Sequence, residues 1–252
     1  MVFEDVSAAD YDRFMGRFSV PLADVFATWA GVPDEGRVLD VGSGPGALTA
    51  VLAERRGASA VTAIDPKPGF VAELALRIPG VDARVGSAEH LPFADDTFAG
   101  VYAELVVHFM TDAHAGIGEM VRVARPGAVV AACVWDFENA RAPHSPFLTL
   151  ASAETGRGRA AARPGTDRGD LHRLRDAGCR DVAEAELSVT AVFDDVDGWW
   201  AVHTLGVGST AHTLDSLDDA AIGRIRAAAR YRFGDGPVEI TGTAWAARGL
   251  AA

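Results

Sequence analysis

The sequence predicts an α/β fold, in which a mostly parallel β-sheet is flanked by helices. Five short apolar runs have the composition of buried strands, and helical patterns follow the first and the fourth of them. A glycine-rich turn joins the first run to its helix. Strands that alternate with helices are typical of parallel sheets. The predicted strands span 37–41, 59–64, 81–85, 98–102 and 128–135, and the predicted helices span 47–57 and 113–124.

Length, composition and charge restrict the class of protein. The 252 residues suit a single domain, and 49% of them are hydrophobic. No apolar run approaches the ~20 residues that span a bilayer, and residues 1–10 do not resemble a secretory signal, so we expect a cytoplasmic protein that does not contact membranes. The net charge of −12 argues against a nucleic-acid substrate. Cys133 and Cys179 are too few for a disulfide framework or a metal site, and we expect both to be reduced.

A helical arm is predicted before the first strand, over residues 7–31. Apolar residues recur there at spacings of three, four and seven, which gives the arm one apolar face. This face either packs on the domain or closes over a ligand. The apolar residues are Tyr11, Phe14, Phe18, Leu22, Val25, Phe26 and Trp29.

The turn after the first strand has the features of a nucleotide-binding loop. Asp40 lies near the end of the strand, and Gly42, Ser43 and Gly44 follow it. Glycines allow a tight turn and let a ligand approach the main chain, and the first N–H groups of the next helix face the same space. The spacing G-x-G-x-G differs from the G-x-G-x-x-G of dinucleotide-binding proteins. By itself, the loop is equally compatible with a turn that binds nothing.

An acidic residue, Asp65, ends the second predicted strand, immediately before Pro66. An ionised carboxylate at this position can accept hydrogen bonds from both hydroxyls of a ribose. Proteins that bind NAD use the same device, so Asp65 favours an adenosine ligand without choosing its type.

Two further candidates follow the fourth strand. Ligands of open α/β sheets bind beyond the carboxyl ends of the strands, so Glu104 is expected near the cofactor or the substrate. His108, in the same loop, is either a general base or a core histidine with a satisfied ring nitrogen.

The regular pattern is interrupted twice after the fifth strand. Residues 136–168 and 194–236 are predicted to form helical caps inserted into the domain, and residues 156–168 are expected to be disordered. A helix over 169–178 and a strand over 179–193 lie between the caps. A last strand is predicted over 237–246.

Three segments together resemble class I S-adenosylmethionine-dependent methyltransferases of the small-molecule, ubiquinone-biosynthesis-like type. The glycine loop resembles motif I of that family, and Gly86–Phe98 resembles its run G-D-A-E-x-L-P-F-x-D-x-S-F-D. Val121–Gly127 resembles its R-V-L-K-P-G-G turn. The resemblance covers about residues 37–135, the expected cofactor-binding core. It implies a Rossmann-like sheet of seven strands that ends in an antiparallel hairpin.

The resemblance also implies the cofactor and the roles of several residues. S-adenosylmethionine would lie over the glycine loop and Asp65. Ser87 stands where the family has an aspartate that contacts the adenine amino group, and the N–H of Ala88 would reach a ring nitrogen. Glu89 is an alternative partner for the adenine. Near the methionine carboxylate the family carries a tyrosine and an arginine, for which Tyr11 and Arg17 are the candidates.

These observations predict an enzyme that transfers a methyl group to an O, N or C nucleophile of a small metabolite. His108, Glu104 and His144 are candidate bases for an acceptor that must lose a proton. Two alternatives stay open: a protein that binds S-adenosylmethionine without transferring its methyl group, and an NAD-dependent oxidoreductase. The sequence does not indicate an oligomeric state.

Overall fold

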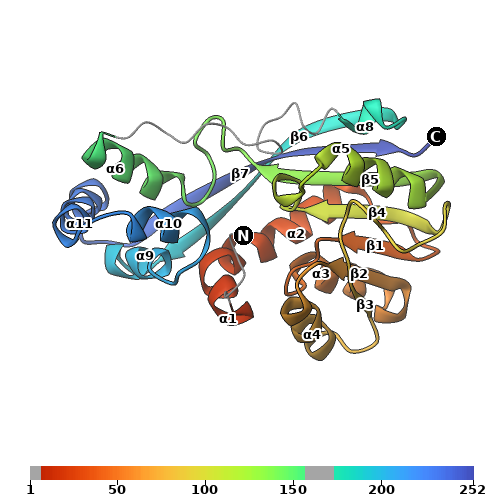
Figure 1. Cartoon of the computed structure of the whole chain (residues 1–252), viewed down its shortest axis with the longest axis horizontal. Coiled ribbons are helices and arrows are strands. Elements are labelled where there is room, and N and C mark those ends of the chain that lie inside the picture. The colour runs from red at the N-terminus through yellow and green to blue at the C-terminus, as the bar shows by residue number, and fades with distance from the viewer. Residues whose placement is uncertain (1–6, 157–172) are drawn as a thin grey trace.

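The computed structural model describes residues 7–156 and 173–252, which form the predicted α/β sheet (Figure 1). Within these residues seven strands lie in the order β3-β2-β1-β4-β5-β7-β6. Neighbours among β1 to β5 are parallel, whereas β7 is antiparallel to both β5 and β6. The predicted mixed sheet and its antiparallel hairpin are therefore confirmed. The strands are β1 (Val38–Val41), β2 (Val61–Asp65), β3 (Asp82–Val85), β4 (Phe98–Glu104), β5 (Ala124–Trp135), β6 (Arg180–Phe193) and β7 (Val238–Leu250).

Helices cover both faces of the sheet. Successive residues of a strand point to opposite faces, so Val38 and Leu39 belong to two separate hydrophobic clusters. The first cluster includes residues of α2 and α3, and the second includes residues of α5 and α8. The bounds are α2 (Arg17–Ala30), α3 (Ala47–Arg56), α4 (Pro68–Arg77), α5 (Ala113–Val123) and α8 (Arg173–Asp176).

The N-terminal arm is helical, as predicted. It consists of α1 (Ala8–Tyr11), the π-helical turn η1 (Asp12–Gly16) and α2. The apolar face of α2 is buried against α3 and against β5, β6 and β7, and its residues Leu22 and Phe26 have no exposed surface. The arm therefore packs against both α3 and the C-terminal hairpin of β6 and β7.

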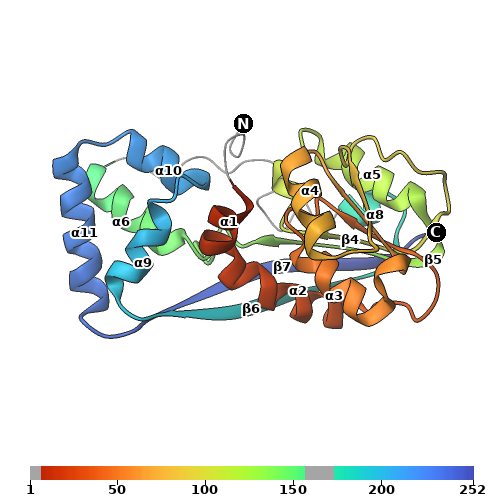
Figure 2. The ribbon, with the colours of Figure 1, turned by 90° about the horizontal axis from the view of Figure 1, so that it is seen from below.

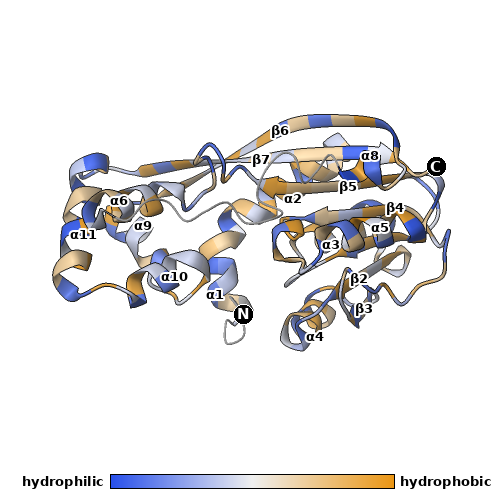
Figure 3. Cartoon of the chain, turned by 45° about the horizontal axis from the view of Figure 1, so that its top comes forward, coloured by the Kyte–Doolittle hydropathy of each residue, from blue (hydrophilic) through white to orange (hydrophobic). Residues whose placement is uncertain are grey.

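β6 and β7 project beyond the carboxyl end of β5. The last residue of β5, Trp135, pairs with Ala244, whereas β6 and β7 stay paired as far as Phe193 and Val238. β6 alternates hydrophilic and hydrophobic residues over much of its length (Figure 3). Four helices gather around the projecting end, and we call them the lid (Figures 1 and 2). They are α6 (Ser145–Thr155), α9 (Val196–His203), α10 (Gly208–Asp215) and α11 (Asp219–Phe233).

Several boundaries differ from the sequence prediction. β5 begins at Ala124 because the Arg125–Gly127 turn is accommodated as an irregularity between β4 and β5. β7 continues to Leu250, four residues beyond the predicted strand, because β5 supplies partners along that length. The helix α4 was not predicted. The helix predicted over 169–178 is described only from Arg173, and the expected disorder at 157–168 lies outside the described residues.

No helix in the described parts of the chain combines the length and the apolar character that crossing a bilayer requires.

Candidate cofactor and substrate site

The carboxyl ends of three adjacent strands carry the predicted site residues. β1 lies between β2 and β4, and all three run in the same direction. Asp40 is in register with Ala63 of β2 and Tyr102 of β4. Asp65 and Glu104, the last residues of β2 and β4, therefore lie on either side of the loop that follows β1. The sheet brings together residues that are up to 64 positions apart.

Hydrogen bonds fix the glycine loop to β2. The N–H groups of Gly42 and Ser43 donate to the carbonyl of Ile64, at 2.7 and 3.1 Å. The N–H of Gly44 donates to Oδ2 of Asp65 at 2.9 Å. Gly42 has φ of +71°, and a Cβ there would overlap the side chain of Val106. A Cβ on Gly44 would meet no atom within 4 Å, so the space above this part of the loop is open.

The carboxylate of Asp65 is held by main-chain donors. Oδ2 accepts from Gly44, and Oδ1 accepts from the N–H of Lys67 at 2.8 Å. Burial raises the pKa of Asp65, while these two hydrogen bonds act in the opposite direction. Each carboxylate oxygen has more than one lone pair, so both can accept a further hydrogen bond from a ligand hydroxyl. Pro66, which lies between Asp65 and Lys67 in the sequence, is exposed.

Asp40 and Glu104 are buried acids close to Asp65. Asp40 is 1% exposed and accepts a 2.5 Å hydrogen bond from the hydroxyl of Thr49. Burial raises the pKa of Asp40 to about 7, with a contribution from the charge of Asp65. Glu104 is 9% exposed, and its Oε1 has no hydrogen-bond partner among the described residues. Burial, and then the charge of Asp40, raises the pKa of Glu104 well above its usual value.

Tyr11 connects the N-terminal arm to these acids. The pKa of its hydroxyl is raised by burial and then by the charges of Glu104 and Asp65. Its ring lies 5.7 Å from that of Phe70, at the start of α4. The arm therefore lies close to the acids at the tips of β2 and β4.

Ser87, Ala88 and Glu89 lie directly after β3, at the next strand tip. The hydroxyl of Ser87 donates to the carboxylate of Glu89, and the N–H of Glu89 donates back to Ser87 Oγ. Glu89 also accepts from the N–H of Thr111 at 2.7 Å. Since its carboxylate already binds the segment before α5, Glu89 has a structural role whether or not it also contacts a ligand. Ala88 is buried.

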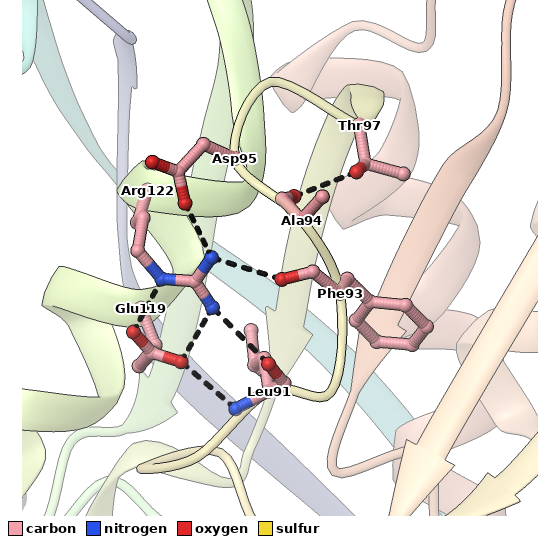
Figure 4. A network of polar contacts seen from close by, with 7 residues as sticks. All are labelled: Leu91, Phe93, Ala94, Asp95, Thr97, Glu119 and Arg122. Carbon is pink, nitrogen blue, oxygen red and sulfur yellow. Dashed lines mark hydrogen bonds and ion pairs between the residues drawn. The ribbon is translucent and has the colours of Figure 1, made fainter.

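Arg122 holds the rest of the Gly86–Phe98 segment through a network of hydrogen bonds and ion pairs, a role that the sequence did not predict (Figure 4). Its guanidinium group donates to the carbonyls of Leu91 and Phe93 at 3.1 and 2.9 Å, and to Asp95 at 2.7 Å. Two further bonds join it to Glu119, which in turn accepts from the N–H of Leu91. Arg122 thereby connects α5 to the loop after β3. The only feature of the sequence that could have drawn attention to Arg122 is its position in the Val121–Gly127 turn, which resembles that of the methyltransferases.

Asp40, Asp65 and Glu104 form an acidic cluster, and three other predicted residues make their contacts away from it. Arg17 stacks on the ring of Phe193 at 5.1 Å and donates to the carbonyl of Val192 in β6. His108 lies in η3 (Val107–Phe109), with its ring 5.3 Å from Phe137. Phe137 is also 5.5 Å from His144, which precedes α6. Both histidines therefore belong to a row of rings between β4 and the lid.

The residues present fit a cationic adenosine cofactor. Glu104 Oε1 and Ser43 Oγ are buried without partners among the described residues, and the space over Gly44 is open. Asp40, Asp65 and Glu104 make the region acidic, which favours a positively charged ligand. Within the described residues, no cluster of three or more His, Cys, Asp or Glu side chains could hold a metal ion.

Comparison with known proteins gives a consistent result. Residues 39–132 match the family model described as "Methyltransferase domain". The demethylmenaquinone methyltransferase of Beutenbergia cavernae is 36% identical over 114 residues, which are 45% of each chain. The chain spans about half the length of the curated relatives it matches, 48% and 42% in two further cases.

Solved methyltransferase structures share the fold over nearly the whole chain. A putative methyltransferase from an antibiotic biosynthesis pathway of Anabaena variabilis has a TM-score of 0.63 at 16% identity, and covers 92% of this chain and 97% of its own. A geranyl diphosphate methyltransferase in complex with SAM has a TM-score of 0.54 at 16% identity, and covers 98% and 92%. The core of the chain is thus similar to methyltransferase domains, and its fold is that of solved methyltransferases.

Proposed function

We propose that the protein binds S-adenosylmethionine across the tips of β1, β2 and β4 and transfers its methyl group to a small metabolite. The observation that carries the proposal is the meeting of Asp40, Asp65 and Glu104 at these tips. Three neighbouring buried acids are costly, and the charge of Lys67 reduces that cost only in part, at Asp65. A ligand with a sulfonium and an ammonium group would offset that cost.

Each part of the site suits one part of the cofactor. Asp65 would accept hydrogen bonds from the ribose, since its two oxygens are already oriented by Gly44 and Lys67. Glu104, with its unpartnered oxygen, would face the positively charged methionine end, together with Tyr11. The open space over Gly44 would admit the cofactor close to the main chain. Ser87 and Ala88 follow β3 at the side where the adenine would lie.

The proposed transfer depends mainly on alignment. The cofactor supplies a methyl group already activated by the positive sulfur. The protein has to hold the acceptor in line and exclude water, which in favourable cases contributes ~7–11 kcal/mol. An acceptor hydroxyl would also lose a proton, for which His108 or His144 is available. A small-molecule acceptor agrees with the net charge of −12, which disfavours nucleic acids.

The proposal is tested first by cofactor binding. Isothermal titration of the full chain should show binding of S-adenosylhomocysteine and none of NAD. Glu104→Gln should weaken the binding of S-adenosylmethionine more than that of S-adenosylhomocysteine, because only the former carries the sulfonium charge. The assignment would be overturned if the protein bound NAD but bound neither S-adenosylmethionine nor S-adenosylhomocysteine.

Transfer is tested separately with methyl-labelled S-adenosylmethionine and a metabolite extract. Label should move to an organic product when the protein is present, and not with a variant that has lost cofactor binding. If the cofactor binds but no pool of acceptors becomes labelled, the protein is a binding or accessory protein instead. This is the second candidate left open by the sequence.

A further inference from the structure

The residue that follows β4 has an unusual backbone conformation. Leu105 comes directly after Glu104 and has φ of +58°. Three other described residues besides glycines have positive φ, namely Asp96, Ala140 and Asp181. Aspartate tolerates the left-handed region and alanine is small, whereas a large branched side chain rarely occurs there. Leu105 therefore adopts a conformation that glycine would adopt at a lower cost.

Two features of the packed structure hold Leu105 in this conformation. Its N–H donates a 2.9 Å hydrogen bond to the carbonyl of Cys133, the register partner of Glu104 on β5. Its side chain is 6% exposed and belongs to the hydrophobic cluster that also contains Phe14 and Phe18 of the arm. A strained residue persists only where the surrounding structure fixes it. The sheet fixes the backbone of Leu105, and the hydrophobic interior fixes its side chain.

The turn at Leu105 brings the next residue onto the glycine loop. Val106 has helical backbone angles and directly precedes η3. Its side chain occupies the place that a Cβ on Gly42 would need. A residue with extended angles at position 105 would instead continue β4 in its own direction. The end of β4 is therefore packed on the loop that follows β1.

Glu104 lies immediately before this turn, and its carboxyl group has little support of its own. It is the last residue of β4, it is 9% exposed, and its Oε1 has no hydrogen-bond partner among the described residues. Asp65 differs, because main-chain donors from Gly44 and Lys67 hold both of its oxygens. The position of the Glu104 carboxyl group therefore depends on the backbone that carries it.

We propose that Leu105 is a positioning residue whose left-handed backbone fixes the carboxyl group of Glu104 at the strand tips, where it faces the positively charged end of the cofactor. The identity of that ligand rests on the proposed function, whereas the position of Glu104 depends on the fold alone. A glycine at position 105 permits the same turn without strain. An alanine keeps the strain and loses the packing that offsets it, so the turn relaxes and Glu104 moves.

The first measurement compares Leu105→Gly with Leu105→Ala by urea unfolding of the full chain. The glycine variant should be the more stable of the two, although it buries fewer apolar atoms, because alanine is disfavoured at positive φ. Leu52→Gly and Leu52→Ala are the matched control pair. Leu52 has no exposed surface, belongs to the same hydrophobic cluster and lies inside α3. In a helix the order is reversed, so Leu52→Ala should be the more stable control.

The second measurement is the affinity for S-adenosylmethionine relative to that for S-adenosylhomocysteine, determined by calorimetry. This ratio isolates the sulfonium charge, which Glu104 would face. It should fall by roughly fivefold or more in Leu105→Ala, because the attraction between two charges weakens as they separate. It should change little in Leu105→Gly and in both Leu52 variants.

The third measurement needs no cofactor. Burial, and then the charge of Asp40, raises the pKa of Glu104. NMR titration of carboxyl carbons, with the Glu104 signal assigned through Glu104→Gln, should show this raised pKa in the wild type and in Leu105→Gly. In Leu105→Ala the pKa should lie nearer to its usual value, because the displaced carboxyl group is less buried.

A packing role alone predicts the opposite order, since glycine removes more of the side chain than alanine does. The proposal is overturned if Leu105→Ala is the more stable variant, or if it keeps both the affinity ratio and the pKa of Glu104. An equal loss of the ratio in the glycine and alanine variants overturns it as well. A wild type that binds neither S-adenosylmethionine nor S-adenosylhomocysteine overturns the proposed function, and the NMR titration then decides the position of Glu104 by itself.

Discussion

The N–H of Gly44 donates a 2.9 Å hydrogen bond to the carboxylate of Asp65. These residues are 21 positions apart and lie at the ends of different strands. The bond makes the glycine loop and the tip of β2 one rigid unit. A ligand that contacts Asp65 therefore also lies next to the open space above Gly44.

Asp65→Asn should lower the affinity for S-adenosylhomocysteine by about tenfold or more, because an amide group can accept only one of the two main-chain N–H bonds. Calorimetry measures the effect. Asp24→Asn is the matched control, since Asp24 is an exposed acid paired with Arg55 on α3. Equal affinities in both variants would contradict the role of Asp65.

Gly42→Ala should mainly lower the stability of the fold, whereas Gly44→Ala should mainly lower the affinity for the cofactor. The first places a Cβ against Val106 at a φ of +71° and should cost on the order of 2–4 kcal/mol of stability. The second has φ of +53° and no neighbour within 4 Å of the new Cβ, so its cost should be about 1 kcal/mol. Its methyl group would instead occupy the space of the cofactor.

Urea unfolding and titration with S-adenosylhomocysteine are measured on both glycine variants. Gly44→Ala should keep most of the stability and lose most of the affinity. A Gly44→Ala variant that binds as well as the wild type would exclude the open space as the cofactor site.

Affinity for S-adenosylmethionine should rise from pH 6 to pH 8. The pKa of Asp40 is about 7, so its deprotonation in this range increases the negative charge near a cationic ligand. S-adenosylhomocysteine, whose sulfur is neutral, should show a smaller rise. Asp40→Asn should flatten the profile. Calorimetry in buffers of different ionisation enthalpy should detect proton release on binding, and its absence would contradict the assignment.

Arg122→Lys should destabilise the protein by about 2 kcal/mol, because a lysine cannot reproduce the planar fork that joins Glu119 to two carbonyls of the preceding loop. Urea unfolding measures the loss. Arg224→Lys is the control, as Arg224 is exposed and its ion pair with Glu154 is long, at 3.5 Å. Similar losses in the two variants would show that the network in Figure 4 contributes little.

His203→Phe should make the protein less sensitive to acid. The folded pKa of His203 is about 3, below the usual 6.5, so the unfolded chain binds a proton that the folded chain does not. Stability is therefore lost as the pH falls below 6.5, at up to about 1.4 kcal/mol per pH unit. The difference in unfolding free energy between variant and wild type should grow between pH 6.5 and pH 4. A constant difference would mean that His203 is protonated in the fold.

The sequence identified residues that act through local geometry. Asp40, Gly42 and Gly44 lie in or beside one turn, Asp65 ends the second predicted strand and Glu104 follows the fourth. The rule that parallel strands present ligands at their carboxyl ends therefore singled out all of them as candidates. Arg122 was seen only as part of a turn, because three of its partners, Leu91, Phe93 and Asp95, lie 27 to 31 positions earlier in the chain.

Arg17 shows where this reasoning stops. Its position on the arm made it a candidate beside Tyr11, yet its recorded contacts are with Val192 and Phe193 in the projecting hairpin. The face of a helix that a residue occupies can be read from the sequence, but the element that this face meets cannot. The same limit applies to the small aromatic cavity beside the arm, because its lining residues Phe14, His144, Phe193 and Trp199 come from four segments of the chain.

Apart from α4, the sequence by itself determined most of the order of strands and helices along the chain, and it determined the glycine loop. Both follow from the spacing of apolar residues and glycines. Only the tertiary structure decided which buried groups lack partners. The raised pKa of Asp40 depends on desolvation by distant segments. So does the cost of leaving Oε1 of Glu104 and both ring nitrogens of His203 without hydrogen-bond partners in the part of the chain that the structure describes. Desolvation is a property of the packed interior, and no local pattern encodes it.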